Sequence, residues 1–105
     1  MDARRLDTLG WLQSPPTAQD DAGQPTGAWV DVVQVWANVR YLSGLETIKA
    51  GAESSTAKAS VRIRARSGVT TGMRFKAGDV MFNIQSVPPV IGTAQFMDLS
   101  TEVRS

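Results

Sequence analysis

Three arginines at alternate positions are the most distinctive chemical feature of the chain. Arg62, Arg64 and Arg66 are separated by single apolar residues. Alternate side chains of a β-strand share a face at intervals of about 7 Å, so the guanidiniums would form a row. Such a row suits repeated phosphates or a complementary acidic edge better than a single carboxylate or a metal ion. A solvated strand face with modest salt bridges is the simplest alternative.

Basic and acidic residues are segregated along the chain. Between Arg5 and Arg40 there is no basic residue, and the acidic residues there are Asp7, Asp20, Asp21 and Asp31. Between Glu53 and Asp79 there is no acidic residue, and the basic residues there are Lys58, Arg62, Arg64, Arg66, Arg74 and Lys76. This asymmetry favours steering of an anionic partner, or contact between the acidic region of one copy, with Asp20 and Asp21, and the arginines of another. Alternatively, the fold brings both regions together within one subunit.

The residue types that enzymes use most often are absent or dispersed. There is no histidine and no cysteine, which removes the commonest general base, the commonest metal ligand and the thiolate nucleophile. Among the ten acidic residues only Asp20 and Asp21 are adjacent, and neighbours in an extended loop point apart. Their surroundings lack the ligand spacing of a calcium loop, and no glycine-rich phosphate loop with a lysine is present. We expect no catalytic residue, no metal site and no cofactor.

The length and hydropathy of the chain predict one domain over residues 1–105. Its longest apolar stretches are a few residues, far below the roughly 20 that span a bilayer. No apolar run follows the charged N-terminus, so no secretory signal is expected. We expect no membrane partner.

Most of the chain carries strand signals. Strands are predicted over residues 6–13, 29–42, 58–67, 80–87 and 93–103, with turns between Gly68 and Gly72 and at residues 76–79. Five or six short strands with one short helix and no repeat favour a mainly β fold. The expected architecture is a small antiparallel β-barrel or sandwich with long loops.

The segment 29–42 carries apolar residues on both of its faces. Either both faces of this strand are covered in part, or a β-bulge shifts its register. Trp29 and Trp36 are predicted to be core and strand-flank residues rather than ligand platforms. Trp11 belongs to a poorly patterned strand and is a candidate for a subunit interface.

Two segments interrupt the strands. Residues 14–28 contain three prolines, two glycines and an aspartate pair, which predicts a long mobile loop or hairpin tip that becomes ordered on assembly. In residues 43–56, Ser43 and Glu46 have the spacing of a capping box. Apolar residues then recur at helical spacing, so a short helix and loop are predicted there, docked through Leu45 and Ile48.

The order of motifs along the chain resembles that of phage head–tail joining proteins, also called head-closure or head–tail adaptor proteins. The motifs are DDAG at residues 20–23, WVDV at 29–32, VWANV at 35–39, LSGLE at 42–46, VRIR at 61–64, VT at 69–70 and MR at 73–74. The resemblance covers residues 4–103, and VWANV followed by LSGLE is its most specific part.

The resemblance implies a non-enzymatic virion protein of a tailed phage or prophage. Such proteins are small β-barrels that form a homo-oligomeric ring beneath the portal, join the DNA-filled head to the tail and help close the head. The implied partners are the portal or connector proteins, the tail proteins and packaged double-stranded DNA. The implied location is the head–tail connector of the virion, and the host cytoplasm during assembly.

In that setting the predicted helix would present Glu46, Lys49 and Glu53 to a partner ring. The competing hypothesis is a monomeric small β-barrel that binds nucleic acid through Arg62, Arg64 and Arg66. Sequence-tolerant binding of single strands needs exposed aromatic side chains beside the arginines, and the sequence does not place them there.

Overall fold

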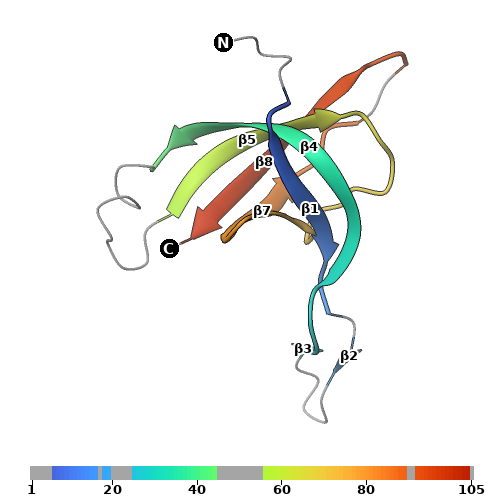
Figure 1. The fold of residues 1–105 in the computed structure, drawn as a ribbon, viewed down its shortest axis with the longest axis vertical. Coiled ribbons are helices and arrows are strands. Elements are labelled where there is room, and N and C mark those ends of the chain that lie inside the picture. Colours follow the sequence, from blue (N-terminus) through green and yellow to red (C-terminus); the bar gives the residue numbers. More distant parts are fainter. Residues whose placement is uncertain (1–5, 17, 20–24, 45–55, 90–91, 105) are drawn as a thin grey trace.

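Strands that alternate apolar and polar residues build a closed barrel. The computed structural model describes residues 6–16, 18–19, 25–44, 56–89 and 92–104. Its strands are β1 (Thr8–Ser14), β2 (Ala18–Gln19), β3 (Pro25–Thr26), β4 (Val30–Ser43), β5 (Thr56–Arg64), β6 (Arg74–Ala77), β7 (Val80–Ser86) and β8 (Phe96–Arg104). The barrel order is β1-β4-β5-β8-β7-β6, and β6 closes the barrel on β1. All of these pairings are antiparallel, so the predicted mainly β antiparallel fold is confirmed, as a barrel (Figure 1).

The core lies inside the barrel, where one face of each strand is buried. In β5 the alternation is complete, because Ala57, Ala59, Val61 and Ile63 are buried while the residues between them are not. Strand β8 pairs with β5 along its whole length and repeats the pattern. The largest fully buried side chains are Phe75, Leu12, Ile63, Leu99 and Val61.

Two irregularities in β4 account for the apolar residues Val32 and Leu42 on its exposed side. Leu12 pairs with Val33 and Gln13 with Asp31, so Val32 is an extra residue. Leu42 is likewise extra, between the partners of Ala59 and Lys58. The bulge interpretation of segment 29–42 is therefore confirmed. Bulges bend a strand, and β4 pairs with β1 through its first half and with β5 through its second half.

The turn predicted at residues 76–79 is shorter than expected. Lys76 and Ala77 belong to β6, and Ala77 pairs with Val80, which leaves a two-residue turn at Gly78 and Asp79. The φ of Gly78 is +60°, in the left-handed region that glycine adopts most readily. Strand β6 was missed because four residues carry too short a pattern. The strand predicted over residues 58–67 also ends earlier, since β5 stops at Arg64 and Arg66 lies beyond it.

Residues 14–28 contain a small hairpin, which we call the arm. Strands β2 and β3 pair with each other and with no strand of the barrel. Figure 1 shows the arm extending away from the end of the barrel where β1 ends and β4 begins. The other interruption, residues 43–56, includes the last residue of β4 and the first of β5. The helix predicted between them, with Glu46, Lys49 and Glu53, lies outside the described residues.

Within the described residues, no helix has the length and apolar character needed to cross a membrane.

Candidate interaction surface

The outer wall of the barrel arranges its side chains in rows that cross the strands. In one row, Asn38 of β4 pairs with Arg62 of β5, and Arg62 pairs with Asp98 of β8. In the next row, Leu9 of β1 pairs with Trp36 of β4, and Arg64 follows on β5. The side chains in both rows point outward because Ala37 and Ile63, the pair between the rows, are buried inside.

Arg62 has a counter-charge within its own subunit. Its Nε donates a hydrogen bond of 2.7 Å to Asp98 Oδ1, and its Nη2 donates one of 3.0 Å to Asp98 Oδ2. The hydrogen bond from Arg62 lowers the pKa of the Asp98 carboxyl below its ordinary value, and the same bond raises the pKa of Arg62. The sequence left open whether the arginines meet an external partner, solvent or a counter-charge of their own subunit, and Arg62 meets a carboxylate of its own subunit. Asp98 is 36 residues from Arg62, so the residues around the arginines in the sequence did not reveal this ion pair.

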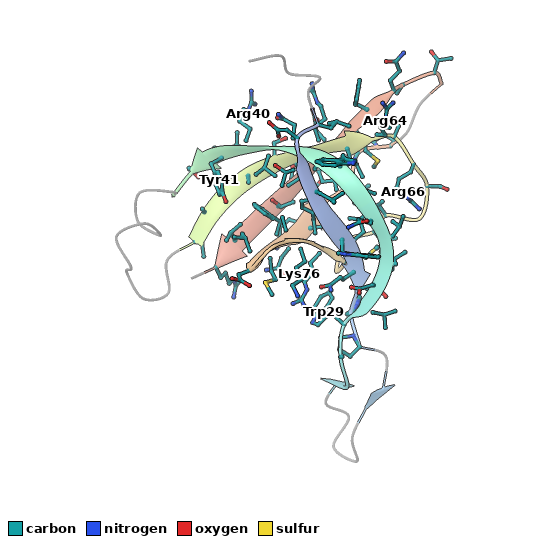
Figure 2. The ribbon with its side chains drawn as sticks, in the orientation of Figure 1. Trp29, Arg40, Tyr41, Arg64, Arg66 and Lys76 are labelled. Atoms are coloured by element: carbon teal, nitrogen blue, oxygen red, sulfur yellow. The ribbon has the colours of Figure 1, made fainter. Side chains whose placement is uncertain are left out.

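Arg64 and Arg66 are exposed and form no ion pair within the described part of the chain. Both border a surface hollow of about 380 Å³, which Trp36 also lines. Figure 2 shows the two arginines on the same side of the barrel, away from Arg40. The charged row predicted from the sequence is thus reduced to these two residues.

Trp36 is not the core or strand-flank residue that was expected. It is 53% exposed, on the opposite face of β4 from the fully buried Ala37. Position alternation alone could have shown this, once Ala37 was taken as the inward residue. The structure therefore places an exposed aromatic ring beside Arg64 and Arg66, which the sequence did not indicate.

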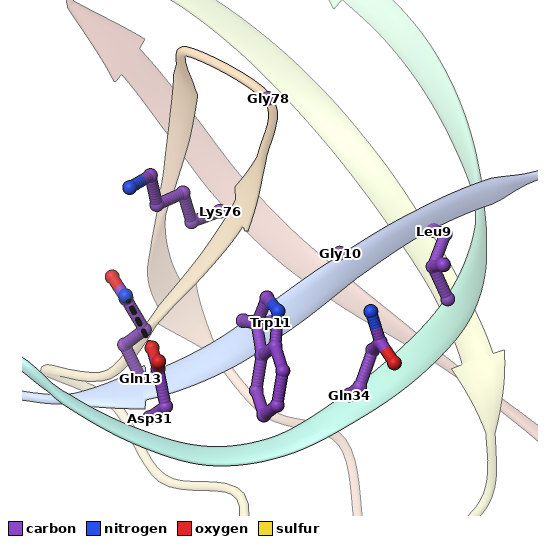
Figure 3. Close-up of a pocket in the computed structure, with 8 residues that line it drawn as sticks. All are labelled: Leu9, Gly10, Trp11, Gln13, Asp31, Gln34, Lys76 and Gly78. Carbon is purple, nitrogen blue, oxygen red and sulfur yellow. Dashed lines mark hydrogen bonds between the residues drawn. The ribbon is translucent and has the colours of Figure 1, made fainter.

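A second hollow of about 380 Å³ lies over β1 (Figure 3). Trp11, 39% exposed, lies between Gln34 of β4 and Lys76 of β6, and it pairs with both residues. Leu9, 41% exposed, continues the surface towards Trp36. We call Leu9, Trp11 and Trp36 the tryptophan strip; Lys76 lies at one end of it and Arg64 at the other.

Gly10 allows β1 and β6 to approach closely beneath this strip. A Cβ at Gly10 would lie 2.6 Å from the Lys76 carbonyl oxygen and 2.6 Å from the Phe75 ring. The glycine that made β1 look poorly patterned is therefore a packing requirement of the barrel seam.

A polar network holds the base of the arm. Arg74 Nε donates to Gln13 Oε1 at 2.7 Å, and Gln13 Nε2 donates to Asp31 Oδ1 at 2.7 Å. The Arg74 guanidinium also lies 4.1 Å from the centroid of the Trp29 ring. Trp29 is half-buried there, which agrees with the predicted strand-flank position. The network joins β1, β4 and β6 at the point where the arm leaves the barrel.

This surface combines exposed aromatic rings with cations. In the described residues, no three side chains of the types His, Cys, Asp and Glu come together as a metal site. Of the residues predicted to act in assembly, Asp20 and Asp21 lie outside the described residues. The fold and surface thus define a small closed β-barrel with a projecting arm and an exposed aromatic and cationic wall.

Comparison with known proteins identifies the family. Residues 1–104 match the family of phage head completion proteins, and the chain belongs to that family. Its members are non-enzymatic structural components of the virion, which confirms the resemblance to phage head-closure proteins. The predictions of a structural, non-enzymatic role and of the virion as its location are confirmed as well.

Two solved structures are similar in fold. A chain from the virion of a native gene transfer agent particle matches with a TM-score of 0.76 and 20% identity, covering 96% of each chain. The solution structure of protein SF1141 from Shigella flexneri 2a matches with a TM-score of 0.68 and 23% identity, covering 98% of this chain and 96% of that one. A comparison with curated proteins found no match.

Proposed function

We propose that this head completion protein assembles as a homo-oligomeric ring that joins the portal of the DNA-filled head to the tail and closes the head. The observation that carries the proposal is the presence of two unlike patches on one subunit. The barrel wall exposes tryptophans beside cations that have no ion pair among the described residues, and the arm is rich in proline and carries Asp20 and Asp21. Contacts between two unlike patches are heterologous, and they close into a ring when the rotation permits.

Arg64 and Arg66 are the residues we assign to assembly. Arg62 is neutralised by Asp98, so it is less available to an external partner than Arg64 and Arg66 are. The counter-charge is either Asp20 and Asp21 of the neighbouring subunit or the phosphates of packaged DNA. The segregation of charge along the chain favours the neighbouring subunit.

The segment between β4 and β5 is assigned to contact with the adjoining ring. Glu46, Lys49 and Glu53 are charged residues at near-helical spacing in this segment. The portal or connector on one side and the tail on the other are the partners that such a ring would meet.

A charge-reversal series in assembling particles tests the proposal. If the partner is a neighbouring subunit, Arg64→Glu should block ring assembly, and Asp20→Arg with Asp21→Arg should partly restore it. Arg104→Glu is the matched control, because Arg104 is an exposed arginine of β8 outside both hollows. The readout is electron microscopy of this chain with its own portal complex.

DNA contact predicts a different result in the same series. Assembly should then survive Arg64→Glu while genome retention falls, and lower salt should strengthen the binding of wild-type rings to duplex DNA. Normal yields of infectious particles from a variant with Arg62, Arg64 and Arg66 all replaced by Gln would show that the arginines are only a solvated face. The absence of this chain from the connector would overturn the proposed function itself.

One observation favours a second candidate, a monomeric nucleic-acid-binding module. Trp36 beside Arg64 and Arg66 supplies a ring for base stacking together with cations for phosphates. Such a module would bind single-stranded DNA as a monomer, with an affinity that falls with salt and is lost in Trp36→Ala. Failure of the purified monomer to bind would exclude this candidate.

A further inference from the structure

We propose that the tryptophan strip of each subunit is covered, in the assembled ring, by the arm of a second copy. The inference rests on the ring proposed above and goes beyond it, because it names the apolar part of the contact and the segment that fills it.

The strip has the composition of a binding hot spot. Tryptophan and arginine are among the residue types that are enriched at the hot spots of protein–protein interfaces. Trp11 and Trp36 are 39% and 53% exposed, and Leu9 between them is 41% exposed. Large apolar side chains gathered at one place on a surface mark a site that another molecule covers.

The two ends of the strip carry cations that a segment with carboxylates would match. Lys76 and Arg64 make no ion pair within the described residues. Nearby cations of the same barrel are already occupied: Arg62 by Asp98, and Arg74 by Gln13 and the Trp29 ring. The exposed tryptophans are therefore flanked at both ends by cations that have no ion pair among the described residues.

The arm has the matching chemistry. Its sequence contains no basic residue, the two carboxylates Asp20 and Asp21, and three prolines, at positions 15, 16 and 25. Proline-rich segments bind in grooves lined with aromatic rings, and carboxylates form charge-assisted hydrogen bonds with guanidinium and ammonium groups. No other segment of the chain combines prolines with an acidic pair.

The arm that covers a given strip comes from another subunit. A subunit's own arm leaves the end of the barrel, and β2 and β3 pair only with each other (Figure 1). The opposite wall of a neighbouring barrel is a poorer source of carboxylates for the strip than the arm, because Asp98 and Glu102 on β8 are already paired with Arg62 and Arg104. An arm-to-strip contact joins two different patches and so continues from subunit to subunit around a ring.

A photoreactive phenylalanine in place of Gln34 identifies what covers the strip. Gln34 lines both hollows. In assembled particles, irradiation should link this position to peptides of the arm of another copy of the same chain. A control with the photoreactive residue in place of Ser100, exposed on β8, should give no link to the arm. Links from position 34 to DNA or to a different virion protein would overturn the inference.

Cysteine pairs give a second measurement, since the chain has no cysteine of its own. A mixture of Gln34→Cys chains and Ala22→Cys chains should form disulfide-linked dimers, and the double variant should form a ladder of larger species. The same experiment with Ser100→Cys in place of Gln34→Cys should form no disulfide-linked dimers. Adding Trp11→Ser and Trp36→Ser to the Gln34→Cys chain should abolish its disulfide to Ala22→Cys. Equal cross-linking by the Gln34 and Ser100 pairs, in particles whose rings are visible, would overturn the inference while leaving the ring intact. Particles that contain no ring of this chain would overturn the proposed function.

Discussion

Arg62 on β5 binds Asp98 on β8 through both oxygens of the carboxylate, at 2.7 and 3.0 Å. The two arginines of β5 therefore differ: Arg62 is neutralised within the subunit, whereas Arg64 has no ion pair among the described residues. The β5 arginine without an ion pair therefore lies beside Trp36 rather than in the middle of the strand.

The Arg62–Asp98 pair should make stability depend on acid. Because the folded-state pKa of Asp98 is lowered, the pair contributes fully above the ordinary carboxyl pKa of about 4 and is lost as pH falls through the folded-state value. Asp98→Asn should cost up to about 1 kcal/mol at pH 7, as expected for an exposed pair, and progressively less as the pH falls below about 4. Thermal unfolding of wild type and variant from pH 2 to 7 measures this. A difference that is constant with pH would contradict it, and Asp79→Asn is the control.

Gln13 should be required for stability because it is buried and joins Arg74 to Asp31. Gln13→Ala removes both hydrogen bonds and should lower the free energy of unfolding by about 1–3 kcal/mol. Gln34→Ala, at an exposed position of β4, should change it by less than about 0.5 kcal/mol. Urea denaturation of both variants tests the contrast, and equal losses would show that the network is not stabilising.

Gly10→Ala should destabilise the barrel where β1 meets β6. Its Cβ would overlap a backbone oxygen and the Phe75 ring, and backbone cannot move aside cheaply. The expected loss is about 1–3 kcal/mol, typical of overpacking. Chemical denaturation measures it, and an unchanged midpoint would mean that β1 and β6 lie further apart than the structure places them.

Two leucines should differ sharply although they carry the same side chain. Leu99 is fully buried and Leu42 is 57% exposed at the bulge of β4. Leu99→Ala should cost about 2–5 kcal/mol through lost burial and a cavity. Leu42→Ala should stay within about 0.5 kcal/mol. Similar losses for the two variants would contradict the placement of the core.

The arm should be the first site of proteolysis in the free subunit. Residues 14–28 combine prolines, glycines and an acidic pair, with little apolar content to offset the entropy of ordering. Limited digestion followed by mass spectrometry should show cleavage within 14–28 before any cleavage in β4, and protection of the arm in assembled particles. Strong protection in a verified monomer would contradict this.

The sequence was sufficient for the parts of the fold that local pattern controls. The alternation in β5 located a half-buried strand with Arg62 and Arg64 on its outer face, because side-chain direction in a strand follows from position alone. Apolar residues on both faces of β4 indicated a bulge, and two bulges are present. The missing histidine and cysteine, with the dispersed carboxylates, pointed away from catalysis, in agreement with the family.

Only the tertiary structure decided which charges are free and which aromatic rings are exposed. Asp98 is 36 residues from Arg62, and no local pattern reveals that β5 and β8 pair in the register that joins them. Trp36 looked like a core residue because tryptophan usually gains free energy from burial. Ala37 pairs with the buried Ile63, and this pairing sets which face of β4 lines the core. The neighbouring Trp36 therefore faces outward, although its side chain is the larger of the two. That pairing is a property of the closed barrel, and it placed Trp36 beside Arg64.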